Sequence, residues 1–342
     1  MTDEKGYVGL ENLGNTCFMN SCLQIIKEIP SLMTILKDKF DKKELKDNVD
    51  SILSIEWYNL TNLMNQHNGV IRPSRFLEVL QKYAKIKNNL LFTGYSQNDV
   101  QEFYLLIINA IHTSIFRQKN ITINGNVEND IDAIAVKCYE TLAQHYRKEY
   151  SETDELFQGI CVNIIQGVES KMTSIKPEIY ADIALPIHFN KQIAGNIYDC
   201  FDIYLKHDYL NNDNKWLNDK TNKKEDAIKY FKFWNFPSVL FILFKRFSLN
   251  GRSKINNVID FPINNLDLTK YVCGYNPDSY KYELFGICNH SGNLHGGHYT
   301  AFVKNKYNKW LHYNDSNIQE IKDESKLVTA KAYCLFYRKK NN

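Results

Sequence analysis

The first half of the chain carries apolar residues at helical spacing. From Asn15 to Glu28 they recur every three or four residues, and Pro30 follows. This spacing places the apolar side chains on one face of a helix, which we expect to end before the proline. The same periodicity predicts further helices at about 51–66, after Pro73, from Ser96, and at about 131–150. The first half is therefore predicted to be helical.

The predicted helix at Ser96 has its own start signal. Asp99 follows three residues later, so the pair resembles a capping box with Asp in place of the usual Glu. The apolar residues that come next would form one buried stripe: Val100, Phe103, Leu106, Ile107 and Ala110. We therefore expect this helix to begin at Ser96 and to pack against the core.

In the second half the pattern changes to short runs rich in β-branched and aromatic residues. These runs predict strands at 156–165, 179–187, 227–234, 239–247, 280–288, 298–303 and 332–337. A short helix is expected at 199–205, and the polar stretch 211–225 is typical of a loop or hairpin tip. Helices followed by strands indicate an α+β fold of two lobes, about 7–150 and about 155–340, in a single domain over 1–342.

Composition and charge argue against several classes of function. Lys and Arg number 42 against 39 Asp and Glu, a net charge of +3, and no long block of like charge suggests nucleic-acid binding. The most apolar runs, 104–111 and 239–244, are far shorter than the about 20 residues that span a bilayer. The first residues lack the features of a signal peptide, and the eight cysteines form no CxxC pair. We therefore expect a protein of the cytoplasm or nucleus, without nucleic-acid or membrane partners.

Cys17 is the candidate nucleophile. It lies in the first turn of the first predicted helix, where free backbone N–H groups and the helix dipole favour a thiolate. Asn12 places an amide donor a few residues away, and Gly14 permits backbone geometry that is closed to other residues. The alternative is a small buried side chain, which fits Cys22. The surrounding residues favour the nucleophile, with Asn12 and the Cys17 N–H as donors to an oxyanion.

A general base is expected from a cluster of histidines late in the chain. His298 follows two glycines, which leave room for a substrate backbone, and a predicted strand begins there. A metal site is the alternative because His290 and His295 are nearby, but no Asp, Glu or Cys stands at ligand spacing, so we expect no metal and no cofactor. Asn314 and Asp315 follow one predicted strand later and can orient the imidazole. An early Cys followed by His and Asn or Asp is the order expected of papain-type cysteine hydrolases.

These residues carry a family resemblance. The segment 9–24 resembles the Cys box of the ubiquitin-specific proteases, and the stretch 282–316 resembles their His box. Three shorter segments are similar to further motifs of the family: 95–103, 244–247 and 332–337. The motifs stand in the family's order over nearly the whole chain. The sequence therefore resembles the ubiquitin-specific proteases, a family of papain-like cysteine peptidases.

The resemblance implies a fold and a set of catalytic roles. The fold would be papain-like α+β, with a helical thumb and β-rich palm and fingers. Cys17 would be the nucleophile on the thumb and His298 the general base and acid on the palm. Asn12 matches the oxyanion residue, Asn314 the third position of the triad, and Asp315 a second acidic residue that can assist His298. Whether Asn314 or Asp315 dominates in orienting the ring stays open at this point.

The resemblance also implies a substrate. Members of the family hydrolyse the bond after the C-terminal glycine of ubiquitin, so ubiquitin and ubiquitinated proteins are the expected partners of a monomeric deubiquitinating enzyme. Six positions match or line the channel that holds the ubiquitin tail: Asp99, Gln101, Glu102, Phe247, His295 and Tyr299. Carboxylates suit this tail because it carries arginines.

Two departures from the family pattern change the expectations. The stretches near 166–169 and 216–221 contain no cysteine, whereas many members bind structural zinc there through two CxxC pairs. Structural zinc is therefore not expected. In the 95–103 motif, Asn98 and Val100 replace the usual Gln and Ala. Two alternative functions remain: a catalytically weak ubiquitin-binding module of the same fold, and a protease for another ubiquitin-like modifier.

Overall fold

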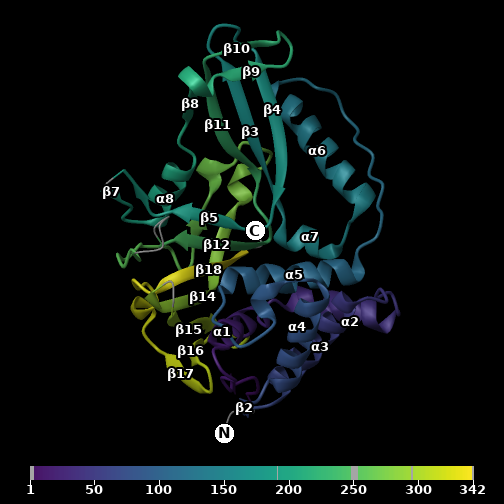
Figure 1. The fold of residues 1–342 in the computed structure, drawn as a ribbon, viewed down its shortest axis with the longest axis vertical. Coiled ribbons are helices and arrows are strands. Elements are labelled where there is room, and N and C mark those ends of the chain that lie inside the picture. The colour runs from purple at the N-terminus through teal and green to yellow at the C-terminus, as the bar shows by residue number, and fades with distance from the viewer. Residues whose placement is uncertain (1–3, 191, 248–252, 294–295, 341–342) are drawn as a thin grey trace.

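A computed structural model describes residues 4–190, 192–247, 253–293 and 296–340 (Figure 1). Its first half is helical, as predicted. The helices are α1 (Cys17–Ile26), α2 (Pro30–Asp41), α3 (Val49–Gln66), α4 (Ser74–Ile86), α5 (Val100–Ile115), α6 (Asp130–Lys148) and α7 (Glu152–Phe157). The sequence did not predict α2, because Pro30 was interpreted as a stop. It occupies the first turn of α2 instead, where a proline loses no helical hydrogen bond.

The start of α5 corrects a second prediction. The helix begins at Val100 and not at Ser96, and Asp99 is its N-cap. The Asp99 carboxylate accepts a hydrogen bond of 2.7 Å from the backbone N–H of Gln101. Because this oxygen satisfies a free N–H group of the first turn, Asp99 alone provides the start signal. The proposed Ser96 capping box is therefore wrong.

The palm sheet is the larger sheet of the second half, at the lower left of Figure 1. Its strands lie in the order β17-β16-β15-β14-β18-β12-β5, with β13 paired to β14. Their bounds are β5 (Ile183–Pro186), β12 (Val239–Lys245), β13 (Leu266–Asp267), β14 (Lys281–Asn293), β15 (Gly296–Lys304), β16 (Trp310–Asn314), β17 (Asn317–Ile321) and β18 (Ala332–Lys339). Although β18 comes last in sequence, it lies in the middle of the sheet, between β14 and β12.

The fingers sheet lies at the top of Figure 1, in the order β4-β3-β11-β8. Its strands are β3 (Gly159–Gly167), β4 (Thr173–Tyr180), β8 (Asp208–Leu210) and β11 (Ala227–Asn235). The hairpin of β9 (Trp216–Asn218) and β10 (Lys223–Glu225) forms its tip, as the polar composition of 211–225 predicted. The predicted strand 179–187 is wrong as a single element, because the chain bends after Tyr180 and passes from the fingers sheet to the palm sheet.

Several short elements complete the described chain. The parallel pair β1 (Val8–Leu10) and β2 (Gly69–Ile71) lies beside α1, and the predicted short helix at 199–205 is α8 (Ile197–Tyr204). The others are β6 (His188–Phe189), β7 (Gln192–Ile193), and the 3-10 helices η1 (Leu90–Phe92), η2 (Asn212–Asn214), η3 (Thr269–Tyr271), η4 (Pro277–Ser279) and η5 (Glu324–Lys326). No described helix is long and apolar enough to cross a membrane.

A shared hydrophobic core joins the helices to the palm sheet. Tyr104 of α5 stacks on Phe241 of β12 with ring centroids 4.5 Å apart, and both side chains are fully buried. Each such burial contributes about 1.5 to 3 kcal/mol to folding. Every residue of α1 is buried between the two halves. The packing therefore fixes the N-terminus of α1 against β15, which is where the candidate site lies.

Candidate active site

Cys17 is the first residue of α1, as predicted, and its side chain is 3% exposed. The backbone N–H of Tyr299 on β15 lies close enough to the sulfur to lower the pKa of the thiol. Burial raises the pKa of the Cys17 thiol, the N–H groups of Tyr299 and Phe18 lower it in part, and the charge of Asp315 raises it further. Together these effects raise the pKa of Cys17, so the helix N-terminus does not by itself produce a thiolate here.

His298 lies on β15, directly before Tyr299, whose N–H lowers the pKa of the Cys17 thiol. Its side chain is 43% exposed, and its Nε2 is 2.7 Å from Oδ1 of Asn314 on β16. Because an amide oxygen only accepts, Nε2 must carry the hydrogen. The other ring nitrogen, Nδ1, is then the basic one in the neutral ring. This tautomer suits a general base, because the basic nitrogen is not the one that bonds Asn314.

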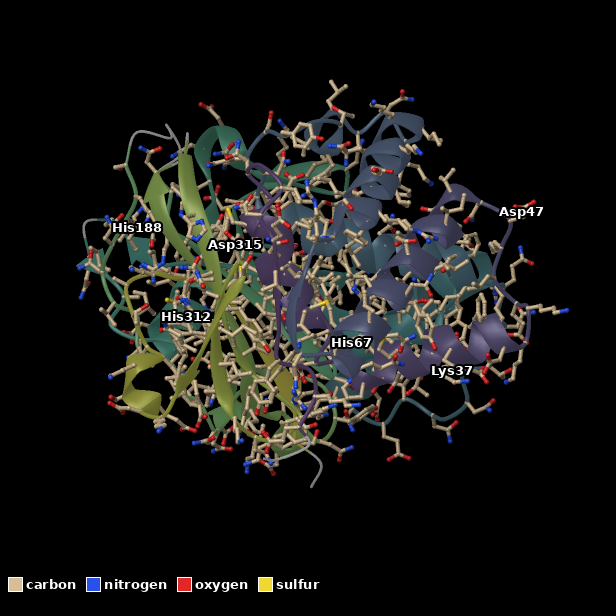
Figure 2. The ribbon with its side chains drawn as sticks, turned by 90° about the horizontal axis from the view of Figure 1, so that it is seen from below. Lys37, Asp47, His67, His188, His312 and Asp315 are labelled. Atoms are coloured by element: carbon tan, nitrogen blue, oxygen red, sulfur yellow. The ribbon has the colours of Figure 1, made fainter. Side chains whose placement is uncertain are left out.

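Asp315 connects three segments that are far apart in sequence. Its carboxylate accepts hydrogen bonds from Nδ2 of Asn12 at 3.0 Å and from Nδ2 of Asn20 at 2.8 Å. One of its oxygens lies 4.0 Å from Nε2 of His298. In Figure 2, Asp315 lies where the strands of the palm meet the N-terminal helix. Asp315 is therefore within electrostatic reach of the imidazole, while Asn314 is its direct partner.

Asn12 is held at both ends of its amide group. Its Oδ1 accepts from the backbone N–H groups of Gly14 at 3.0 Å and Thr16 at 3.1 Å, and its Nδ2 donates to Asp315. Gly14 has φ +102°, a conformation in which other residues are strained. One hydrogen of Nδ2 bonds Asp315, so the second is free to donate to a ligand. The loop before α1 therefore presents an oriented amide donor near Cys17.

Asp99 and Tyr299 come together, but Gln101 and Glu102 do not join them. The second carboxylate oxygen of Asp99 accepts from the hydroxyl groups of Tyr333 at 2.8 Å and Tyr299 at 3.4 Å. Gln101 instead donates to Asp182, and Glu102 is exposed on the first turn of α5. The predicted substrate contacts therefore occupy two places, one inside the site and one on its rim.

A small cavity of about 120 Å³ lies beside Asp99 and Tyr299. Phe247 and His290 also line it. His295, the remaining predicted contact, falls outside the described residues. Lys254 lies 3.0 Å from Nδ1 of His290 and donates to its carbonyl oxygen. Burial, followed by the charge of Lys254, lowers the pKa of His290 to about 4, so this ring is neutral at pH 7 and differs in role from His298.

Several residues of the site were missed from the sequence. Asn20 lies one helical turn after Cys17, and that spacing could have suggested a shared face. Tyr333 and His290 fall inside motifs of the resemblance, yet neither was assigned a role in catalysis or substrate binding. Gln97 bonds the backbone of Gly297, and Asp182 binds Gln101. These partners lie far apart along the chain, so no local sequence pattern indicated either contact.

No group of described residues has the geometry of a metal site. At the fingertip, the carboxylate of Glu225 accepts from Nδ2 of Asn218 and from the backbone N–H and hydroxyl of Ser170. These bonds connect the turn after β3 to the β9–β10 hairpin. This connection joins the two stretches, near 166–169 and 216–221, that contain no cysteine.

Comparison with known proteins places this geometry in a family. A model of the ubiquitin carboxyl-terminal hydrolase family matches residues 8–337. Ubiquitin carboxyl-terminal hydrolase 2 of Homo sapiens is 30% identical, over 97% of this chain and 55% of that protein. Ubiquitin carboxyl-terminal hydrolase 21 of Homo sapiens is 29% identical, over 97% of this chain and 61% of that protein. The chain thus spans little more than half the length of these relatives.

Solved structures give the same answer for the fold. A SAGA DUB module of Ubp8, Sgf11, Sus1 and Sgf73 bound to monoubiquitin matches with a TM-score of 0.74 and 27% identity. The match covers 100% of this chain and 71% of that one. The predicted papain-like α+β fold, with thumb, palm and fingers, is therefore confirmed. From the family model over residues 8–337, this chain belongs to the ubiquitin carboxyl-terminal hydrolase family.

Proposed function

We propose that this protein is a deubiquitinating cysteine protease that cleaves the bond after the C-terminal glycine of ubiquitin. One arrangement carries the proposal: Nε2 of His298 bonds Asn314 at 2.7 Å, and the N–H of Tyr299, the next residue along β15, lies close enough to the Cys17 sulfur to lower the pKa of the thiol. A base with a fixed tautomer beside a thiol at a helix N-terminus is suited to thiolate attack on a carbonyl. Membership of the family supports ubiquitin as the substrate.

In the first step, Nδ1 of His298 takes the proton of the Cys17 thiol, and the sulfur attacks the glycine carbonyl. The Cys17–carbonyl bond forms as the carbonyl electron pair moves to oxygen. Nδ2 of Asn12 and the backbone N–H of Cys17 stabilise this oxyanion. The negative charge of Asp315, 4.0 Å from Nε2, favours the imidazolium that forms at the same time.

In the second step, the imidazolium of His298 gives its proton to the leaving lysine amine, and the acyl-enzyme remains. Water then attacks the thioester while His298 takes a proton from it, and Cys17 leaves. Asn314 keeps the ring in one orientation through both steps because its oxygen can bond Nε2–H in the neutral and the charged ring.

The ubiquitin tail is proposed to occupy the cavity beside Asp99 and the rim near α5. Asp99, Gln101 and Glu102 supply oxygen atoms for the basic tail, and Phe247, His295 and Tyr299 line its path. Two of these groups are already engaged, because Asp99 holds two tyrosine hydroxyls and Gln101 holds Asp182. Glu102 is exposed and is therefore the group we expect to meet an arginine first.

We further propose that the partners are ubiquitin and ubiquitinated proteins, that the enzyme is a monomer, and that it acts in the cytoplasm or nucleus. The single catalytic domain spans the chain, with the thumb at about 7–150 and the fingers and palm at about 155–340. Related structures with bound ubiquitin support the first of these proposals.

The test uses ubiquitin with a thiol-reactive group at its C-terminus. Wild-type protein and the Cys17→Ala variant are incubated with it, and intact mass reports a covalent adduct. We expect one ubiquitin on the wild type and none on the variant. Cys22→Ala is the matched control, since this thiol is fully buried on the same helix, and it should react like the wild type.

Two other results would lead to other functions. An adduct with a probe made from another ubiquitin-like modifier, and none with ubiquitin, would assign the protein to that modifier. Binding of ubiquitin without any adduct on folded wild-type protein would identify a catalytically weak binding module. An adduct on Cys17→Ala would exclude Cys17 as the nucleophile.

A further inference from the structure

Among the described residues, no strand pairs with one side of β15 beside the candidate nucleophile. β14 pairs with β15 from Gly296 onward, but β16 pairs with it only from Ala301 to Lys304. Successive residues of a strand direct their N–H and C=O groups to opposite sides, so Gly297 and Tyr299 face the same way. The N–H of Tyr299 is directed toward the Cys17 thiol and lowers its pKa. Gly297 therefore presents its backbone along the open edge, next to the reacting thiol.

A side chain already occupies this open edge. The N–H of Gly297 donates to Oε1 of Gln97 at 2.8 Å, and Nε2 of Gln97 donates to the carbonyl oxygen of Gly297 at 3.0 Å. A primary amide has one acceptor and one donor side by side, as a neighbouring peptide strand does. Gln97 thus makes the pair of hydrogen bonds that an added strand would make.

Gln97 reaches this edge from the other half of the molecule. It lies in the loop before α5, and its Nε2 is also 3.4 Å from Oδ1 of Asn15, in the loop before α1. The side chain is exposed, and it lines the same small cavity as Asp99 and His290. Its contacts therefore connect both predicted catalytic loops, although nothing buries it there.

The opposite face of Gly297 is closed. A Cβ atom at Gly297 would lie 2.2 Å from Nε2 of His290 and 2.6 Å from the carbonyl oxygen of Ser291. A peptide can therefore not approach Gly297 from that face, whereas the open edge presents the N–H and C=O groups that Gln97 now bonds. The group that must leave this edge is the amide of Gln97.

We propose that Gln97 occupies, in the free enzyme, the main-chain site that the terminal glycines of ubiquitin take when they bind. This inference rests on the proposed function and deepens it. The substrate backbone replaces the Gln97 amide by forming the same two hydrogen bonds with Gly297. Because two bonds are broken and two are made, Gln97 acts as an internal competitor that weakens substrate binding without changing the chemical step.

The experiment replaces Gln97 with Met, which has a similar length but cannot form the two bonds. Steady-state kinetics on ubiquitin with a fluorogenic C-terminal amide should show KM lowered about three- to tenfold and kcat unchanged. Ubiquitin binding to Cys17→Ala should tighten by a similar factor when Gln97→Met is added. Gln81→Met is the control, because Gln81 also bonds loop backbone, at Gly94, and should leave both constants unchanged.

Other outcomes would contradict either this proposal alone or the proposed function as well. If the variant hydrolyses ubiquitin with an unchanged or raised KM, or with a lowered kcat, Gln97 stays in place as a clamp and the proposal is wrong, while the proposed function stands. If the wild type neither hydrolyses nor binds ubiquitin, the proposed function and this inference are both wrong.

Discussion

Two carboxylates organise polar networks in distant parts of the molecule: Asp315 directly follows β16 of the palm, and Glu225 lies on β10 at the fingertip. Figure 1 shows β16 and β10 toward opposite ends of the molecule. Both accept hydrogen bonds from asparagine amides, Asp315 from Asn12 and Asn20, and Glu225 from Asn218. The two networks differ in whether hydrogen-bonding groups remain available to a ligand. This difference distinguishes the network that we propose to support catalysis from the network that joins the fingertip turns.

The hydrogen bonds of the fingertip network join fingertip residues to one another. Glu225 accepts three hydrogen bonds, and the donors belong to the two turns that it joins. Gly167 packs so closely on it that a Cβ atom there would lie 2.5 Å from the carboxylate. No space for a ligand remains between these groups. We conclude that this carboxylate stabilises the fingertip and has no part in catalysis.

The palm network stays open toward solvent. His298 is 43% exposed, and Nδ2 of Asn12 keeps one hydrogen that Asp315 does not take. Asp315 itself has φ +49°, an uncommon backbone conformation for a residue other than glycine. Incomplete hydrogen bonding and an unusual backbone conformation are typical of functional sites, where the remaining groups are used by a ligand.

The largest effect is expected from removing the proposed base. His298→Ala should lower kcat by about 10³- to 10⁴-fold, since no other group would take the thiol proton. Steady-state hydrolysis of a fluorogenic ubiquitin substrate measures this change in kcat. His67→Ala, at an exposed histidine after α3, is the control and should retain full activity. A His298 variant with more than a tenth of wild-type activity would contradict the assignment.

A smaller effect is expected from neutralising Asp315. Asp315→Asn should lower kcat about 100-fold, because the new amide cannot accept from both Asn12 and Asn20 and no longer favours the imidazolium. Asn314→Ala should lower kcat by a smaller factor, about tenfold, since only one hydrogen bond to the ring is lost. Comparing the two kcat values decides which residue dominates. A larger loss in Asn314→Ala would show that ring orientation is the main requirement.

At the fingertip, stability should change and activity should not. Glu225→Gln is expected to lower Tm by roughly 2 to 4 °C at pH 7 with unchanged kcat. The Asn218 amide, followed by Ser170, lowers the pKa of Glu225 from 4.5 to about 2. Its contribution to stability is therefore complete above pH 4.5 and is lost as the pH falls toward 2. Tm measured between pH 7 and pH 3 should show the two proteins converging below pH 4.5.

The matched control for this variant is Glu178→Gln. Glu178 is exposed on β4 of the same sheet, and among the described residues it forms one ion pair, a contact of 3.8 Å with Lys176. Exposed pairs of this kind contribute little, so Tm should change by less than about 1 °C. A Glu225 variant that loses activity in proportion to Tm would show that the fingertip takes part in catalysis after all.

No effect at all is expected from a metal chelator. Because hydrogen bonds to Glu225 join the fingertip turns, EDTA should leave both Tm and the hydrolysis rate unchanged. Thermal unfolding and activity are measured before and after dialysis against the chelator. If the chelator lowers Tm or the hydrolysis rate and added zinc restores it, the comparison is contradicted and a metal supports the fingers.

The sequence predicted the parts of this molecule that depend on local pattern. The helices at 51–66 and 131–150 have the expected periodicity, and the order of Cys17, His298 and Asn314 suggested a papain-like site. Pro30 misled the prediction of α2, because a proline can end one helix or begin the next. Elements with a strong hydrophobic periodicity were therefore easier to predict than the boundaries between elements.

Contacts between distant segments could not be predicted in this way. Asn20 bonds Asp315, 295 residues away, and Gln97 bonds Gly297, 200 residues away. Nothing in the pattern around these residues specifies such partners, because the sheet and helices must first bring them together. The role of Asp315 as a junction appears only in the folded structure.

The central place of β18 affects when the protein acquires its fold. Residues 332–339 pair with β14 on one side and β12 on the other, so the palm stays in two parts until they arrive. On the ribosome, Cys17 emerges more than 300 residues before this strand is made. Pairing over such separations is slow, and the exposed edges of β12 and β14 would invite aggregation meanwhile. We expect the nascent chain to depend on chaperones until β18 has been synthesised.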